Sequence, residues 1–427
     1  MDVPSPGPAP LANVLTARRL GLDTQHEAMV FVRAECPVCR SEGFSAHSRV
    51  QLSHGSRSII ATLYQTSTNL VSDREIGLSE AAWHRLGLED GEQIFISHPA
   101  PLESLNKVRG KVFGHRLDDA ATRAIIADIV AGRYSDIHLS SFITACSALP
   151  LDVSETIALT RAMVETGSKL SWDRAPIADK HCVGGLPGNR TTPIVVAICA
   201  SLGLTVPKTS SRAITSPAGT ADTMEVITEV DLDLGAMRQV VDQEGGCFVW
   251  GGGVQFSPAD DAMIRIERAL DLDSEGAMAA SVLSKKIAAG ATHVVIDIPV
   301  GPTAKVRSQA AAESLQSLLE KVAAEFGLKV RSLVTDGTQP VGRGIGPALE
   351  ARDVLAVLRN APDGPPDLAD RACLIAGALL ELVGKASPGA GKAMALDVLR
   401  SGAAYVKFES ICRAQGGFRE PALAEHS

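Results

Sequence analysis

The chain has 427 residues, of which 45% are hydrophobic and 21% charged, and its formal net charge is −8. These totals are typical of a globular enzyme with two or three domains, whereas the negative charge and the low aromatic content of 4% argue against a nucleic-acid platform. No stretch approaches the ~20 apolar residues of a membrane span, and the Pro-rich start lacks the pattern of a signal peptide. We therefore expect small-molecule substrates, with no nucleic acid and no membrane as partner.

The eight cysteines are scattered, mostly in apolar contexts, as are reduced thiols in a cytoplasmic protein. Cys36 and Cys39 form a lone C-x-x-C motif. With His47 or His54 this pair could hold zinc, it could have a redox role, or the two could be plain surface thiols. We adopt the last interpretation, and therefore predict no metal site and a cytoplasmic protein.

The N-terminal hundred residues are predicted to contain a leader and a β-rich domain. Prolines recur in residues 1–20, which we expect to lack regular structure. Residues 21–103 should form a small, barrel-like β-rich domain with a short helix at residues 79–86. Its strands are predicted where apolar runs contain β-branched residues, at residues 29–32, 58–63 and 93–96.

Helices are predicted in the next segment, residues 104–172. Asp118 and Asp119 can cap a helix whose isoleucines recur at helical spacing. Asp152 and Glu155 have the spacing of a capping box at the start of a further helix. We expect residues 263–290 to return to this helical domain.

Strands and helices alternate through residues 173–262 and 291–427, which predicts an α/β domain with a largely parallel or mixed sheet. Residues 193–202 form an apolar helix of small residues, suited to burial, and residues 293–300 a buried strand. Ligands of such sheets bind at loops beyond the carboxyl ends of strands. The predicted fold class is α/β, with a helical domain and an α/β domain with a mixed sheet, preceded by the small β-rich domain.

Two loops rich in Gly, Ser, Thr, Lys and Arg flank the predicted buried helix, at residues 179–192 and 208–220. Glycine lets a backbone approach a ligand and expose its N–H groups. Hydroxyl and ammonium groups add donors, and a helix N-terminus attracts an anion. Local positive charge comes from Lys180, Arg190, Lys208 and Arg212. We predict a phosphate site here, although neither loop contains the P-loop motif.

Other candidates for chemistry follow these loops. Asp273 precedes a predicted helix, where it could be a general acid with a raised pKa or simply the helix cap. Ser281 and Lys285 share one face of that helix. Lys305 follows a buried strand, and His181 could take part in catalysis or be packed in the core.

These motifs resemble those of the thymidine/pyrimidine-nucleoside phosphorylase family, most closely the branch with the AMP phosphorylases and the type 2 thymidine phosphorylases. The likeness extends from about residue 28 and includes residues 75–79, 281–286, 291–297 and 414–417. It implies a helical and an α/β domain closing over a cleft, and an N-terminal domain special to this branch. It also implies that phosphate attacks the anomeric carbon with inversion, with inorganic phosphate as co-substrate and no cofactor. We further expect a homodimer or larger homo-oligomer.

The site residues of this family carry over position by position. Phosphate ligands of the thymidine phosphorylases match Lys180, Thr192, Ser210 and Thr220. Nucleotide contacts of the AMP phosphorylases match Gly185, Ser211, Arg212, Ala213, Ile214, Thr215, Ser216, Thr220, Ser281 and Lys305. The proton donor of the AMP phosphorylases matches Asp273.

Departures from the family pattern bear on the substrate. The thymidine phosphorylases have a histidine in the loop at residues 215–220, where this chain has none, and their base-binding arginine falls near Ile266, between Arg265 and Arg268. Both differences favour a nucleotide, since the donor-rich loop can hold an additional 5′-phosphate. Cys182 replaces the serine of the family, and a thiol is a weaker donor than a hydroxyl. Because the family continues beyond residues 414–417, we expect a shortened C-terminal portion.

Three functions follow from these observations. The first is a phosphorylase that cleaves nucleoside 5′-monophosphates such as AMP with phosphate, giving ribose 1,5-bisphosphate and a free base. The alternative is a thymidine or pyrimidine-nucleoside phosphorylase. A further alternative, suggested by Cys182 and the shortened end, is a non-catalytic nucleotide-binding homologue.

Overall fold

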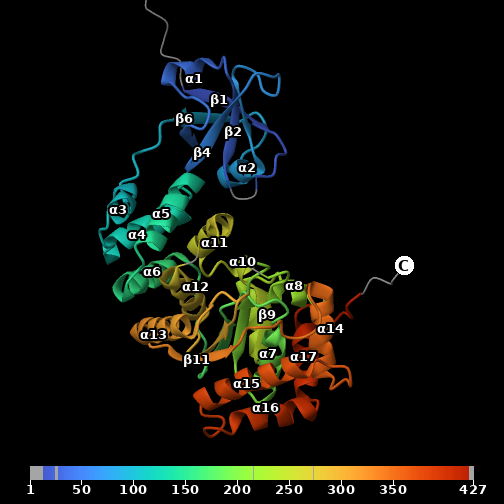
Figure 1. Cartoon of the computed structure of the whole chain (residues 1–427). Coiled ribbons are helices and arrows are strands. Elements are labelled where there is room, and N and C mark those ends of the chain that lie inside the picture. Colours follow the sequence, from blue (N-terminus) through green and yellow to red (C-terminus); the bar gives the residue numbers. More distant parts are fainter. Residues whose placement is uncertain (1–12, 25–26, 215, 273, 423–427) are drawn as a thin grey trace, which may run out of the picture. The chain divides into compact units, whose positions relative to one another are not determined.

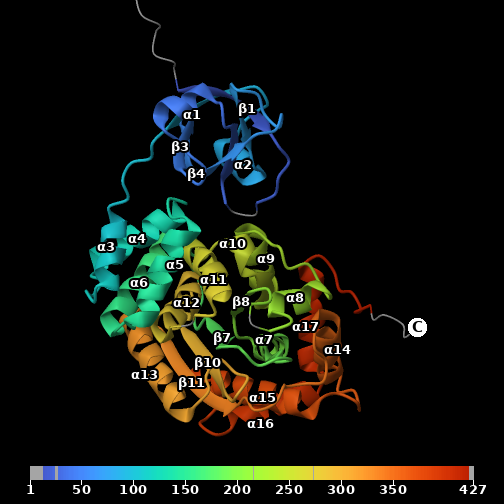
Figure 2. The ribbon, with the colours of Figure 1, turned by 45° about the horizontal axis from the view of Figure 1, so that its top comes forward.

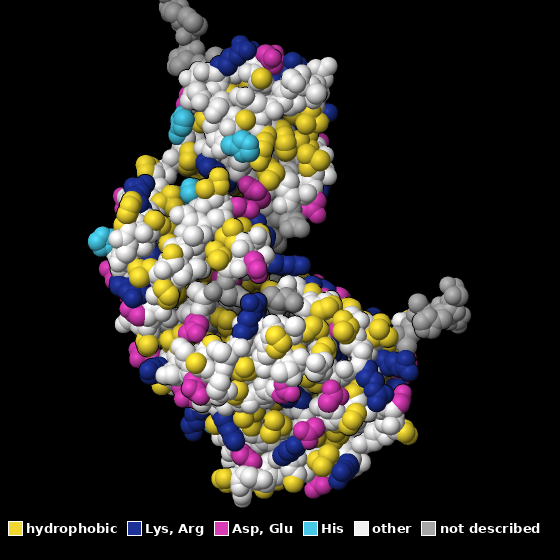
Figure 3. Space-filling model, in the orientation of Figure 1, with side chains coloured by type: hydrophobic (Ala, Val, Ile, Leu, Met, Phe, Trp, Pro, Cys, Tyr) yellow, Lys and Arg dark blue, Asp and Glu magenta, His cyan; other side chains and the backbone are white. Residues whose placement is uncertain are grey.

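The computed structural model describes residues 13–24, 27–214, 216–272 and 274–422. The chain divides into two units, of which one comprises Met1–Glu103 and Ala131–Ser135 and the other Ser104–Val130 and Asp136–Ser427 (Figure 1). Within the described ranges, no helix is long and apolar enough to cross a membrane. Basic and acidic side chains are interspersed over most of the visible face (Figure 3), so this face offers no extended basic surface for a polyanion.

The first unit is a closed β-barrel with the strand order β1-β5-β2-β4-β3-β6. Alternate residues of β2 and β3, such as Val30, Val32, Val50 and Leu52, are fully buried, as expected where one face of each strand points into the barrel. The elements are β1 (Val14–Arg19), β2 (Met29–Arg33), α1 (Pro37–Glu42), β3 (Arg49–His54), β4 (Arg57–Thr66), β5 (Glu75–Leu78), α2 (Glu80–Leu86) and β6 (Gln93–Ser97).

Two predictions for this unit need correction. The predicted leader is too long, because β1 pairs with β5 and β6 and directs Leu15 and Ala17 into the barrel. Cys36 and Cys39 are not surface thiols, since they are 0% and 1% exposed and belong to the barrel core. In the part of the chain that the structure describes, no group of three His, Cys, Asp or Glu side chains could hold a metal ion.

The second unit contains a helical half. α11 and α12 return to this half and pack against its earlier helices. Asp152 and Glu155 form the predicted capping box, and the Glu155 carboxylate also accepts a 2.6 Å hydrogen bond from buried Lys111. The helix α3 was not predicted. The helices are α3 (Ser104–Val112), α4 (Asp119–Val130), α5 (Asp136–Ala148), α6 (Val153–Thr166), α11 (Pro258–Leu270) and α12 (Glu275–Ala288).

The other half of this unit is built on parallel strands. β10 pairs with β11 and β7, β8 pairs with β9, and a parallel bridge between Ile177 and Thr205 links the two groups. The chain passes from β7 to β8 in one direction and from β10 to β11 in the other, so the strand order reverses between β7 and β10. Ligands bind at such switch points in open α/β sheets. The strands are β7 (Ala178–Cys182), β8 (Val206–Ser210), β9 (Gly246–Trp250), β10 (His293–Val300) and β11 (Lys329–Asp336).

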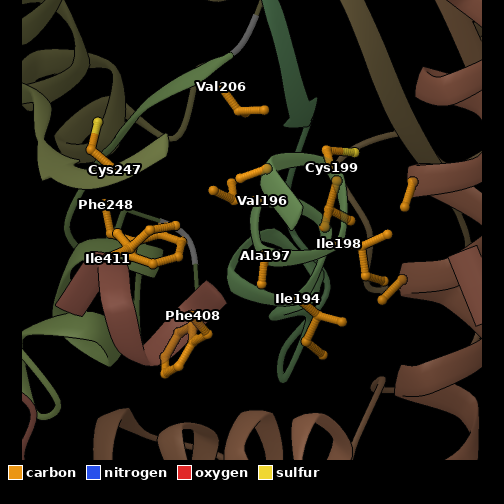
Figure 4. Packing of buried hydrophobic residues seen from close by; sticks show 14 of the residues in the cluster. Ile194, Val196, Ala197, Ile198, Cys199, Val206, Cys247, Phe248, Phe408 and Ile411 are labelled. Atoms are coloured by element: carbon orange, nitrogen blue, oxygen red, sulfur yellow. The ribbon is translucent and has the colours of Figure 1, made fainter. Parts of the chain in front are cut away.

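Helices cover both faces of the sheet (Figure 2). Val294, Ile296 and Ile298 of β10 pack with α12 and α13, whereas Val295 joins the core around α7. The predicted buried helix is α7 (Thr191–Ser201), whose apolar side chains face strands and C-terminal helices together (Figure 4). The remaining helices are α8 (Thr220–Glu225), α9 (Leu234–Glu244), α10 (Gly251–Val254), α13 (Gln309–Glu325), α14 (Pro347–Leu358), α15 (Pro366–Leu382), α16 (Gly391–Arg400) and α17 (Ala403–Ala414).

Candidate active site

A cavity of about 550 Å³ lies at the carboxyl ends of β7, β8, β9 and β10, between these strand ends and the helices α11 and α12. This is the switch point of the sheet. The cavity brings together both predicted loops, α12 and the loop after β10. The predicted site residues that line it are Lys180, Gly185, Thr192, Ser210, Ser211, Arg212, Ile214, Ser216, Thr220, Ser281 and Lys305.

The lysine-rich end of the cavity, where phosphate is predicted to bind, is built from strand residues as well as from loops. Lys180 lies within β7, is 1% exposed, and its Nζ donates to Thr191 Oγ1 at 2.7 Å. Ser210, the last residue of β8, has a buried Oγ without a hydrogen-bond partner among the described protein atoms. Buried hydroxyls are almost always hydrogen-bonded, so this atom indicates a ligand position.

A buried carboxylate holds two further lysines at this end. The Asp179 side chain lies 3.3 Å from Lys208 Nζ and 2.8 Å from Lys286 Nζ, and Lys208 Nζ also donates to the Lys180 carbonyl oxygen at 2.8 Å. Asp179 itself is 0% exposed. Lys208 and Lys286 thus share one carboxylate, which leaves positive charge that an anion can balance.

Burial determines the protonation of the neighbouring groups. Burial lowers the pKa of Lys180 and, far more, that of Lys208, although Asp179 opposes both shifts. Burial and the surrounding lysines hold the pKa of His181 well below its usual value, so the imidazole is neutral at pH 7. Burial and Asp297 raise the pKa of Cys182 to about 12, so this residue is a neutral thiol.

The second loop is fixed by acidic residues of α8. The Asp222 carboxylate accepts hydrogen bonds from Ala213 N at 2.7 Å and Gly219 N at 2.8 Å. The Arg212 guanidinium binds both carboxylate oxygens of Glu225 and stacks over Trp250, 4.9 Å from the ring centroid. The predicted contact Ala213 is not part of the cavity lining, because its backbone is turned towards Asp222.

Gly185 shows why the first loop needs glycine. Its φ of 86° lies in the left-handed region, and a Cβ atom there would meet Lys305 N at 2.3 Å. Any other residue would push the loop after β10 away. Gly185 therefore allows the predicted nucleotide contact Lys305 to lie beside the first loop.

The opposite wall of the cavity is formed by α11 and is acidic. It presents Asp261, Glu267 and Asp271, together with Arg268. Desolvation in the cavity raises the pKa of Asp261 to about 6. A neighbouring carboxylate, Asp260, binds Lys285 Nζ at 2.5 Å.

The position expected for a base-binding arginine is occupied by Ile266, which is 5% exposed and packed inside. Of its neighbours, Arg265 binds both carboxylate oxygens of Asp136 at 2.7 Å, whereas Arg268 lines the cavity. An arginine therefore reaches the cavity two positions later than the family pattern places it.

Thr215 and Asp273 lie outside the described residues, so their predicted roles stay predictions. The neighbouring Ser274 is the N-cap of α12, and its Oγ accepts a hydrogen bond from Ala277 N at 3.2 Å. The helix therefore has a cap other than Asp273.

Sequence reasoning missed Asp179, Lys286 and Asp261 as site residues. Asp179 and Lys286 looked like ordinary charged neighbours of predicted ligands, and only the fold shows that they meet. A usable signal was the presence of Lys285 and Lys286 at the end of a helix that is otherwise mostly small and apolar, because lysine is rarely buried without a partner.

Comparisons with known proteins agree with this architecture. Residues 174–405 match the family described as "Glycosyl transferase family, a/b domain", and residues 103–167 match its "helical bundle domain". A protein of Sphingopyxis alaskensis named "Putative thymidine phosphorylase" is 59% identical over 428 residues, which cover 99% of this chain and 83% of that protein. A protein of the same name from Chelativorans is 59% identical over 413 residues, covering 96% and 81%.

The chain belongs to the thymidine/pyrimidine-nucleoside phosphorylase family. It is a pentosyltransferase with a phosphorylase-type activity. Among solved structures, anthranilate phosphoribosyltransferase of Thermus thermophilus matches with a TM-score of 0.60 over 73% of this chain and 99% of that chain. Its sequence identity of 22% shows the shared fold alone, a helical bundle beside an α/β domain. The membership speaks against the alternative of a non-catalytic homologue.

Proposed function

We propose that this enzyme cleaves the N-glycosidic bond of nucleoside 5′-monophosphates with inorganic phosphate, giving ribose 1,5-bisphosphate and a free base. The observation that carries the proposal is the joint lining of one cavity by the lysine-rich end and the donor-rich second loop. The first can hold the attacking phosphate and the second the 5′-phosphate of the substrate. AMP is the substrate on which we base the tests.

The attacking phosphate would lie against Lys180, Thr192, Ser210 and Thr220, which all line the cavity. The orphaned Ser210 Oγ would donate to a phosphate oxygen, and the excess positive charge near Asp179 would balance the anion. Held in this way, phosphate can attack the anomeric carbon from the face opposite the base, which gives inversion.

The leaving base needs a proton, which a carboxyl group can supply. A carboxylic acid is an effective donor when its pKa lies near the working pH. We assign this role to Asp273 on its match to the family's proton donor. The raised pKa of Asp261, about 6, supports a role for a protonated carboxyl group on this side of the cavity.

The 5′-phosphate would be bound by the loop at residues 211–216. Two donors of this loop are already hydrogen-bonded within the protein. The Arg212 side chain donates to Glu225, and the backbone N–H of Ala213 donates to Asp222. We infer that Arg212 shapes the loop, as does Ser216, whose Oγ donates to the Ala218 carbonyl oxygen at 2.8 Å, and that the donors for the phosphate are Ser211 and the remaining backbone N–H groups.

A second candidate function is thymidine or pyrimidine-nucleoside phosphorolysis. It is favoured by the names of the similar proteins and by Arg268, which lines the cavity and could bind a pyrimidine base.

The two functions are separated by a substrate panel. The protein is incubated with phosphate and with AMP, CMP, UMP, thymidine or uridine, and release of free base is measured by chromatography. We expect base release from at least one nucleotide, and ribose 1,5-bisphosphate as the second product by mass spectrometry. Release from thymidine or uridine and from no nucleotide would overturn the proposal.

A further inference from the structure

A buried ion pair lies behind both phosphate loops and has no part in the chemistry proposed above. Arg190 immediately precedes α7, and Glu350 lies in the first turn of α14. Their side chains are 2% and 1% exposed, and an Arg190 Nη1 atom contacts Glu350 Oε2. Neither residue lines the cavity, so neither can touch a substrate there.

The pair is hydrogen-bonded to both loops. On one side, Arg190 Nε donates to the Gly188 carbonyl oxygen at 2.6 Å, within the first loop. On the other side, Glu350 Oε2 accepts a 3.0 Å hydrogen bond from Thr223 Oγ1 of α8, the helix that begins at Thr220. One carboxylate thus connects the loop after β7 to the helix that ends the loop after β8.

The surroundings make this connection rigid. Gly188 has a φ of 73°, and a Cβ atom there would meet Val341 O at 2.7 Å, so the first loop is packed against the segment before α14. Glu350 Oε1 also accepts from Gly346 N at 3.0 Å. Burial lowers the pKa of Arg190 only to about 9, so the guanidinium stays charged at pH 7 and requires its carboxylate.

We propose that Glu350 is a positioning residue that sets the spacing between the two phosphate loops through Arg190 and Thr223. The inference rests on the proposed function, because this spacing matters for catalysis only if both loops hold phosphate groups. Displacement of a substrate-binding group by about 1 Å can reduce the rate by about 10²-fold, so a residue outside the cavity can have a measurable effect.

The test compares two equivalent substitutions in the full-length protein. Glu350→Gln removes the charge that joins the loops. Glu155→Gln removes the carboxylate of another buried pair, with Lys111 in the helical half, where the side chains are 0% and 2% exposed. Both variants leave a buried cation with a weaker partner, so both should lower the unfolding temperature. Only the first should affect the phosphate loops.

Two measurements distinguish positioning from stability. Hydrogen exchange of residues 184–190 and 219–224 should become faster in Glu350→Gln and stay unchanged in Glu155→Gln. The KM for phosphate should rise about tenfold in Glu350→Gln, equivalent to about 1.4 kcal/mol, with kcat changed less than about threefold. Unchanged exchange in both segments, or the same KM change in both variants, would overturn the proposal.

Thr223→Val provides a milder test in case Glu350→Gln does not fold. It removes the hydrogen bond from Thr223 Oγ1 to Glu350 and the local one to the Gly219 carbonyl oxygen, and it leaves Arg190 paired with Glu350. We expect faster exchange confined to residues 219–224 and a smaller rise in the KM for phosphate. If the wild-type protein releases no base from any substrate, the proposed function fails, whereas the exchange comparison still decides whether Glu350 holds the loops.

Discussion

The two sides of the cavity hold their charges in different ways. On the sheet side, Lys180 and Lys208 are buried and Asp179 holds the second of them in place. On the α11 side, Asp261 and Arg268 line the cavity and remain partly exposed to solvent, although burial of the Asp261 carboxyl group raises its pKa. Fixed, desolvated charges suit an anion that must always occupy the same position. Exposed groups that titrate suit a leaving group that must receive a proton. The comparison therefore supports the proposal that the cavity has a phosphate side and a base side.

The largest effect should come from the phosphate side. Lys180→Met removes the buried ammonium group and keeps the length of the side chain. We expect kcat/KM for phosphate to fall by about 10³-fold, the upper range seen when one preorganised donor is removed. The same substitution at exposed Lys329, the first residue of β11, is the control. A loss of less than tenfold in steady-state kinetics would show that Lys180 is only a structural lysine.

The next effect concerns the base side. Asp273→Asn should lower turnover by about 10²-fold or more, the range for removal of a general acid, with little change in nucleotide binding measured by calorimetry. Because Ser274 already caps α12, Ser274→Ala provides a control that should lower stability and leave turnover nearly intact. Unchanged turnover in Asp273→Asn would remove the proposed proton donor.

A smaller effect is expected at Cys182, again on the phosphate side. Cys182→Ser restores the hydroxyl that the family has at this position, and a hydroxyl is the stronger donor. The gain of about 1 kcal/mol for a better hydrogen bond should lower the KM for phosphate by about fivefold. An equal or higher KM in the variant would show that the side chain does not reach phosphate.

The smallest effect is a pH dependence at Asp261. Below its pKa of about 6 the group is neutral, and above it the group is anionic and repels a nucleotide. The ratio of the AMP KM values of wild type and Asp261→Asn should therefore be near one at pH 5. It should rise to about three at pH 8, as expected for one nearby charge in water. A ratio that does not change between these pH values would contradict the assignment.

Much of the fold could be predicted because local sequence determined it. The capping box of Asp152 and Glu155 marks the start of α6, and the largely apolar segment at residues 293–300 becomes the strand β10. The residue at which the leader ends could not be predicted. Apolar and polar residues alternate in β1 over only a few positions, and this pattern indicates a strand only when β5 and β6 pair with it. The burial of Cys36 likewise depends on closure of the barrel.

The candidate site was predicted wherever a motif determines it, and missed wherever distant segments meet. Residues of the two loops line the cavity as expected. Asp179, by contrast, gains its role from Lys286, more than a hundred residues later in the chain. Glu350 reaches Arg190 from α14 in the same way. No sequence pattern predicts either of these two contacts.

The most direct test of the central claim is the ratio of kcat/KM values for AMP and adenosine at saturating phosphate. If the second loop binds a 5′-phosphate, its charge-assisted hydrogen bonds should favour AMP over adenosine by about 10²-fold, or about 2.7 kcal/mol, and thymidine should be no better than adenosine. Equal values for AMP and adenosine, or a higher value for thymidine, would contradict the account and identify the enzyme as a nucleoside phosphorylase.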